Sequence, residues 1–402
     1  MSIESERARK LEQFLAQDPS NPLLLRDIAV TYQTAGEIEK ALESFEKLRV
    51  LADDDPFVLN SLGALYLSLN RGKEAIEVLR LASKLAPEEP NLLFNLGYAH
   101  FSLGETEVAR DLFIKLIDLS PDTPEFLYYL ALTYDELGDV DTSRVFLDKV
   151  LALEPDHLRG QQFYALSDLQ SGHLQDAQYR TKTILERQPN NVEALQLKAE
   201  IALLDFDAKL ALSALRKAES VDPLEPHTQL LLGQTLLMLQ RSKQARKAFE
   251  KAIELDQSSA FAHTGLGWAA LFLGDTKTAE HAFSQAIMAD HNLADAYTGM
   301  AGLALSLDNH EEAERQAKQA LMLHPDDITA RLILESIKQK KDGSQSISLD
   351  MQDLLKDHSL TPIGWSAKDI ASKFQDSKTG KSVINKHLRH TRMRKTSEKN
   401  TL

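Results

Sequence analysis

Small residues recur along this chain at one constant interval, and this interval constrains the fold more than any other feature. A Gly or Ala returns nine times in one register, and a second small residue follows each of them after twelve positions. A proline follows twelve positions later in six of the nine cases. The first column consists of Ala29, Gly63, Gly97, Ala131, Ala165, Ala199, Gly233, Gly267 and Ala301. Such a period predicts an array of repeated structural units.

Each unit has the pattern of two short helices. In the third unit, Leu96 and Gly97 fall on one helical face, and Phe113 and Leu116 fall on the face of a following helix. We expect the two backbones to nearly touch at the small residues, where a large side chain would cost about 1–3 kcal/mol. The proline ends the second helix. Because one such hairpin cannot bury its apolar face alone, stacked hairpins are expected to share a continuous core.

The pattern resembles the tetratricopeptide repeat. The residues of the second unit that match its signature are Leu59, Leu62, Gly63, Tyr66, Ala75, Leu79, Ala82 and Pro87. Nine units cover 22–327. The resemblance implies an all-α, right-handed superhelical solenoid of helix-turn-helix units with a concave inner groove.

The segments outside the nine units are predicted to have distinct roles. Residues 1–21 are expected to hold an N-terminal capping helix, with Leu11 and Phe14 turned inward. Residues 328–341 are expected to form a C-terminal capping helix, and 342–402 form a basic, mostly disordered tail. Within the array, Thr181 and Lys198 occupy positions that favour apolar residues, so we expect a soft point or bend near 160–207.

In the resembled family, partners usually bind in the groove lined by the first helix of each unit. Aromatic side chains offer large contact areas there, and asparagines can bond a peptide backbone. The predicted partner-binding residues are Phe57, Asn60, Asn91, Phe94, Asn95, Tyr98, Phe101, Tyr128, Trp268 and Phe272. Aromatic residues in this phase can also serve the packing of the helices, and the sequence leaves both roles open.

The charge is distributed unevenly. The whole chain has a net charge of −14, while 338–402 carry 14 Lys+Arg against 7 Asp+Glu, a net of +7. The predicted basic-tail residues are Lys381, Lys386, Arg389, Arg392, Arg394 and Lys395. Short amphipathic helices are predicted around Leu349–Leu355 and Ala367–Phe374. The tail is predicted to contact the acidic array within the same chain, to bind nucleic acid or an anionic membrane, or to recruit another partner.

The sequence lacks the signatures of catalysis. It contains no cysteine, which excludes disulfides, thiolate metal sites and a cysteine nucleophile. No cofactor, metal site or catalytic residue is predicted, and no signal peptide or apolar run of membrane-spanning length is found. We therefore expect a cytoplasmic, non-enzymatic scaffold or adaptor that binds a partner protein or peptide in the groove. The alternative is a regulator that associates with nucleic acid or an anionic membrane through its tail.

Overall fold

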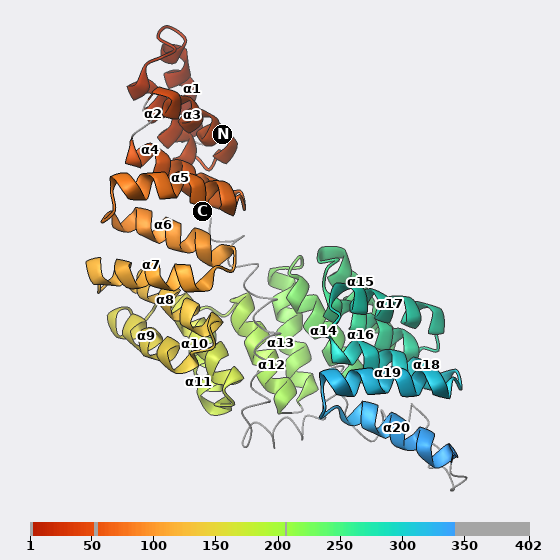
Figure 1. Cartoon of the computed structure of the whole chain (residues 1–402). Helices are drawn as coiled ribbons and strands as arrows, with labels where there is room; N and C mark the ends of the chain where they lie inside the picture. The colour runs from red at the N-terminus through yellow and green to blue at the C-terminus, as the bar shows by residue number, and fades with distance from the viewer. Residues whose placement is uncertain (1–2, 52–54, 206, 342–402) are drawn as a thin grey trace. The chain divides into compact units, whose positions relative to one another are not determined.

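The computed structural model describes residues 3–51, 55–205 and 207–341, which form twenty α-helices and no strand (Figure 1). Nine helix pairs lie between α1 (Ile3–Leu15) and α20 (Ile328–Lys341). The first helices of the pairs are α2 (Pro22–Thr34), α4 (Pro56–Ser68), α6 (Pro90–Ser102), α8 (Pro124–Glu136), α10 (Leu158–Gln170), α12 (Val192–Leu204), α14 (Pro226–Met238), α16 (Ala260–Phe272) and α18 (Ala294–Ser306). The second helices are α3 (Ile38–Leu51), α5 (Gly72–Leu85), α7 (Thr106–Leu119), α9 (Val140–Leu153), α11 (Leu174–Arg187), α13 (Ala208–Val221), α15 (Ser242–Leu255), α17 (Thr276–Ala289) and α19 (His310–Leu323).

The period of the sequence is the period of the helices. Successive first helices begin at the same interval that separates Ala29 from Gly63, and so do successive second helices. The all-α fold of nine helix pairs is therefore confirmed. None of the helices in the described part of the chain is both long and apolar enough to cross a lipid bilayer.

Local sequence explains where the helices begin and where the pairs turn. Five first helices begin with proline, which has the helical φ angle and needs no hydrogen-bond partner for an N–H group. Between the two helices of a pair, one residue commonly adopts a left-handed conformation, which glycine tolerates best. Gln240 breaks the glycine pattern at this position, yet its φ is 56°, so it makes the same turn with some strain.

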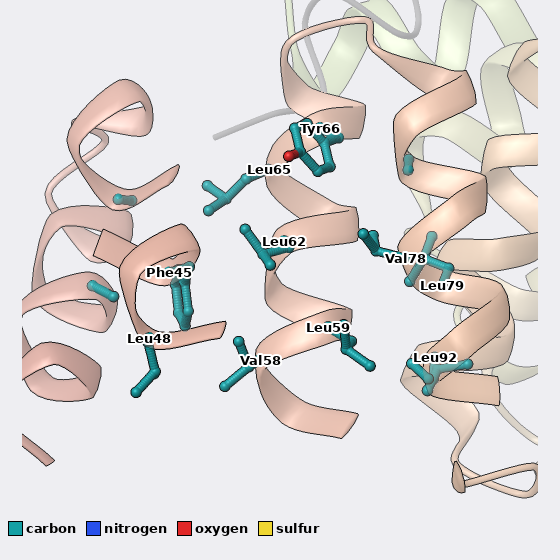
Figure 2. Packing of buried hydrophobic residues seen from close by; sticks show 14 of the residues in the cluster. Phe45, Leu48, Val58, Leu59, Leu62, Leu65, Tyr66, Val78, Leu79 and Leu92 are labelled. Atoms are coloured by element: carbon teal, nitrogen blue, oxygen red, sulfur yellow. The ribbon is translucent and has the colours of Figure 1, made fainter. Parts of the chain in front are cut away.

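The described chain divides into two compact units. Unit 1 comprises residues 3–161 and unit 2 comprises 162–341, with the division inside α10. The core of each unit lies between neighbouring helices. Figure 2 shows this packing in unit 1, where Phe45, Leu62 and Leu79 lie between consecutive helices.

The small column is explained by side-chain size. A Cβ atom on Gly63 would lie 2.4 Å from Cγ of Leu79, and one on Gly97 would lie 2.7 Å from Cε1 of Phe113. The nearest obstacle is thus the bulky side chain of the second helix, whereas the sequence led us to expect the opposing backbone. Gly63, Gly97, Gly233 and Gly267 each lie against a Leu or Phe of the second helix, whereas Ala301 stands opposite the smaller Ala317.

The first helix, α1, packs on α2 through one of its faces. Ala8 of α1 is fully buried, and the hydroxyl of Tyr32 donates a hydrogen bond to Oε1 of Glu12 at 2.7 Å, so one face of α1 packs on α2. Leu11 is partly buried, but Phe14 is 58% exposed. The prediction that Phe14 points inward is therefore wrong, because the face of α1 that carries it is not the face packed on α2.

Candidate protein-binding surface

Aromatic rings gather on two consecutive first helices of unit 1. We call Phe94, Tyr98 and Phe101 of α6, with Phe126 and Tyr129 of α8, the aromatic cluster. The ring centroid of Phe94 lies 5.1 Å from that of Tyr129 and 5.4 Å from that of Phe126. The cluster rests on the fully buried Phe113, 6.2 Å from Phe94. Such rings form a preorganised apolar surface at little conformational cost.

Three predicted binding residues lie in this cluster. Phe94, Tyr98 and Phe101 are each half-buried, so part of each ring remains accessible. Burial raises the pKa of the Tyr98 hydroxyl to about 12, so this side chain stays neutral. Tyr128 differs from the prediction, since only 4% of it is exposed and it contributes to packing.

Tyr129 was not among the predicted residues, although its ring contacts Phe94, Tyr98 and Phe101 of the cluster. Its ring centroid lies 5.4 Å from Tyr98 and 6.5 Å from Phe101. The adjacent aromatic residues on two successive first helices were the signal that could have identified it.

An ionic group borders the cluster. Arg159 of α10 donates to both carboxylate oxygens of Glu125, and its guanidinium carbon lies 5.0 Å from the ring centroid of Tyr128. Burial acts to raise the pKa of Glu125, but the hydrogen bonds from His157 and Arg159 outweigh it and hold the pKa below its ordinary value. Glu125 is therefore ionised at neutral pH, and Arg159 is fixed beside the rings. The sequence analysis had not singled out either residue.

The neighbouring α4 carries the rest of the predicted set in unit 1. Phe57 is 39% exposed, and the guanidinium carbon of Arg26 lies 4.1 Å from its ring centroid. Asn95 donates a hydrogen bond from Nδ2 to Oδ1 of Asn60 at 2.9 Å, which joins α6 to α4. Asn91 is exposed. Phe57 and this amide pair extend the surface from α6 and α8 onto α4.

The predicted residues of unit 2 form a smaller group. Trp268 is only 6% exposed and packs against the buried Phe283 at 5.6 Å between ring centroids, so it differs from the prediction as Tyr128 does. Phe272 is half-buried, with its ring centroid 5.8 Å from that of Trp268. Of the two predicted residues in unit 2, only Phe272 therefore has an accessible ring, whereas several of the predicted residues of unit 1 do.

The sequence analysis also made predictions about the basic tail and about metal binding. The six predicted basic-tail residues lie outside the described residues. Across the described ranges, no group of three or more His, Asp or Glu side chains is arranged to hold a metal ion. The surface carries accessible aromatic rings beside the side-chain amides of Asn60 and Asn95.

Stacked pairs of antiparallel helices, each pair packed on the next, define a helical-repeat protein. A family model described as "Tetratricopeptide repeat" matches residues 60–122, 94–157 and 207–260. The matched segments are tetratricopeptide repeats, and the helix pairs of the described residues continue the same pattern on both sides of them. A comparison with curated protein sequences gave no match.

Solved structures with the same fold come from different sources. A tetratricopeptide repeat protein from Parabacteroides merdae has 18% identity and a TM-score of 0.55, with 62% of this chain and 98% of that chain covered. A human IFIT1 dimer with PPP-AAAA has 17% identity and a TM-score of 0.56, with 95% of each chain covered. At these identities the likeness concerns the fold.

Proposed function

We propose that this protein is a non-enzymatic scaffold that binds a peptide segment of a partner protein on the aromatic cluster of unit 1. The observation that supports the proposal is the set of half-buried rings of Phe94, Tyr98 and Phe101, each of which packs against the buried ring of Tyr129. Half-buried aromatic residues on a rigid support are typical of the residues that dominate binding energy in protein interfaces.

The amide pair adds a means of recognising the peptide backbone. Asn60 and Asn95 share one hydrogen bond, which leaves the second N–H of Asn95 and the amide N–H groups of Asn60 able to donate to peptide carbonyls. Apolar side chains of the peptide would then contact the rings of the aromatic cluster. An extended or helical apolar segment fits this combination.

The net charge of unit 1 indicates the sign of the charge that a partner should carry. Residues 1–161 carry 29 Asp+Glu and 16 Lys+Arg, a net of −13, whereas 162–341 carry 24 and 19, a net of −5. A field of this sign attracts basic segments and speeds their association at low salt. The proposed ligand is therefore an apolar peptide with flanking Lys or Arg residues.

The experiment is a selection of random twelve-residue peptides on the full-length protein. Selected peptides are expected to be rich in apolar and basic residues. They are expected to bind the Phe57→Ser and Tyr98→Ser variants at least tenfold more weakly, which corresponds to about 1.4 kcal/mol.

The matched control is Tyr179→Ser in unit 2, because Tyr179 is 72% exposed and lies on the second helix α11. Peptides are expected to bind this variant as they bind the parent protein. Circular dichroism melting of all three variants checks that the fold persists. Selected peptides that bind the two unit 1 variants with unchanged affinity would refute the proposed site.

The alternative function, association with nucleic acid or an anionic membrane, depends on the tail outside the described residues and stays a prediction. Binding of the full-length protein to duplex DNA or to vesicles with anionic lipid would test it. If the alternative is correct, binding falls steeply as salt rises and is lost when 342–402 are removed.

A further inference from the structure

Three consecutive second helices of unit 2 have a lysine in the first turn and no acidic residue there. The lysines are Lys209 of α13, Lys243 of α15 and Lys277 of α17, one repeat interval apart, and we call them the lysine row. All three are exposed. Each of the other six second helices has at least one acidic residue in its first turn.

The lysine row does not serve the stability of its own helices. The N-terminus of a helix carries partial positive charge, which an acidic residue offsets and a lysine increases. Glu107 and Asp141 occupy the equivalent position on α7 and α9. Within the described ranges the lysines of the row form no ion pair, although other cations of the same helices do, namely Arg216, Arg246 and Lys251. Residues that break a local rule without compensation within the fold are expected at functional sites.

Ion pairs between helices place the members of the row on neighbouring elements. Nζ of Lys251 on α15 lies 3.6 Å from Oε1 of Glu219 on α13. Arg246 of α15 donates from Nη1 to Oδ2 of Asp275 at 2.9 Å, and Asp275 caps the N-terminus of α17. These contacts join α13 to α15 and α15 to α17 within unit 2. The lysine row therefore crosses three adjoining second helices.

The three helices are positively charged in a negatively charged unit. Together α13, α15 and α17 carry 8 Lys+Arg and 4 Asp+Glu, a net of +4, whereas unit 2 has a net of −5. Lys217 of α13 and Lys247 of α15 are also exposed and add to this charge. The charge complementary to this surface is an acidic group, and the positive region is small.

We propose that the lysine row binds a short acidic segment of a partner protein, whose successive carboxylates contact Lys209, Lys243 and Lys277. In an extended segment, residues three positions apart are separated by about 10 Å, which is also the spacing of packed helices. A short segment contacts the row alone and is little affected by the acidic groups elsewhere on the unit, because salt screens exposed charges beyond about 10 Å.

Other occupants suit this surface less well. Single-stranded nucleic acid binds through bases stacked on exposed aromatic rings, but the aromatic residues of these three helices, Phe249 and Phe283, are fully buried. An extended polyanion would also meet the acidic remainder of unit 2. The basic segment 338–402 has the same sign as the row, and two whole chains of net charge −14 repel each other.

The test uses the full-length protein and a twelve-residue peptide with the sequence Glu-Gly-Ser repeated four times. A carbodiimide joins glutamate carboxylates to lysine amines that they contact, and mass spectrometry identifies the lysines. The three lysines of the row are expected to cross-link at least about fivefold more than Lys73. Lys73 is the matched control because it is exposed and occupies the same position on α5, where Glu74 follows it.

A second measurement removes the row. In the triple variant Lys209→Gln, Lys243→Gln and Lys277→Gln, cross-linking at Lys217 and Lys247 is expected to fall to the level of Lys73. The melting temperature is expected not to fall, since the lysines do not stabilise their helices.

The control variant combines Lys73→Gln, Lys84→Gln and Lys338→Gln, which changes the net charge equally at exposed positions elsewhere. It is expected to leave cross-linking at the row unchanged. Row lysines that react no more than Lys73 would overturn the proposal. So would protection of the row from acetylation by a twelve-residue oligothymidylate or by phosphatidylserine vesicles but not by the peptide. The proposed peptide site in unit 1 is unaffected by either result, because it concerns basic segments.

Discussion

Gly265 in α16 lies against the ring of Phe249 in α15, where a Cβ atom would stand 2.3 Å from Cε1. The same ring would meet a Cβ atom on Gly233 at 2.5 Å, so Phe249 is held between two glycines. Gly265→Ala would gain about 1 kcal/mol of helix propensity. The new methyl group would, however, clash with the Phe249 ring, which is confined on its other side by Gly233. Such overpacking costs about 1–3 kcal/mol. We expect a net loss of stability and a lower melting temperature.

The rescue variant for this prediction is Gly265→Ala with Phe249→Leu. A shorter side chain removes the contact with the new methyl group, so the double variant should be less destabilised than the sum of the two single changes. Additive losses in urea denaturation would show that the ring does not restrict Gly265.

Thr181 stands at a position where Leu or Phe fills the core in most other pairs. It is 2% exposed, and among the described residues its hydroxyl has no hydrogen-bond partner. A buried hydroxyl without a partner costs about 1–3 kcal/mol. Thr181→Val keeps the shape of the side chain and is expected to raise the free energy of unfolding by about 1 kcal/mol.

Thr183→Val serves as the control for this change, because the Thr183 hydroxyl already donates to the Tyr179 carbonyl oxygen at 3.0 Å. The urea midpoint should rise for Thr181→Val and stay nearly constant for Thr183→Val. A fall in the midpoint of Thr181→Val would mean that the hydroxyl is bonded in solution.

Residues 160–207 are predicted to exchange their backbone amide hydrogens faster than the rest of the described helices. Thr181 weakens the core there, and the division between the two units falls at the start of this region. Fewer apolar contacts lower the free energy of local opening. Hydrogen exchange measured by mass spectrometry checks the expectation, with α14 to α17 as the internal reference. Equal protection in both regions would contradict it.

Asp295 provides a pH-dependent contribution to stability. Burial, followed by the nearby Asp327 carboxylate, raises the pKa of Asp295 well above its ordinary value of 3.8. Thr298 Oγ1 donates to Oδ2 of Asp327 at 2.5 Å, and the Ala330 amide donates to Oδ1 at 2.9 Å. In the unfolded chain Asp295 loses its proton near its ordinary pKa, whereas the folded protein holds the proton to higher pH. Stability therefore falls as pH rises through this interval.

Asp295→Asn is accordingly expected to stabilise the protein at neutral pH and to have little effect below pH 3.8. Urea unfolding at several pH values measures the difference, with the exposed Glu280→Gln as the control. A stabilisation that is the same at every pH would show that ionisation of Asp295 is not its cause.

The sequence predicted the helical pairs well because one physical requirement repeats in every unit. A small residue such as Gly97 leaves room for a side chain of the second helix such as Phe113, and a small residue therefore recurs at this position in every unit. Gln240 shows the limit of such reasoning. Its turn has the left-handed conformation although the residue is not glycine, because the packed helices on both sides determine the backbone there.

The candidate site was less predictable because exposure depends on neighbouring repeats. Phe94 and Tyr128 occupy equivalent positions on successive first helices, yet Phe94 is half-buried and Tyr128 is buried. The difference arises beside Tyr128, where Arg159 from the next first helix covers its ring. Identical spacing in the sequence cannot show which large side chain the following repeat will cover.

The unvarying spacing of helix starts has a consequence for how such a chain changes over generations. Since every pair begins at the same distance along the chain from the one before, removal or duplication of one whole interval joins equivalent points of two pairs. Lengthening and shortening by recombination therefore leave the register of all remaining helices intact. Features that occur once, such as the ion pair of Glu125 and Arg159, join two successive pairs and are the ones that such an event would separate.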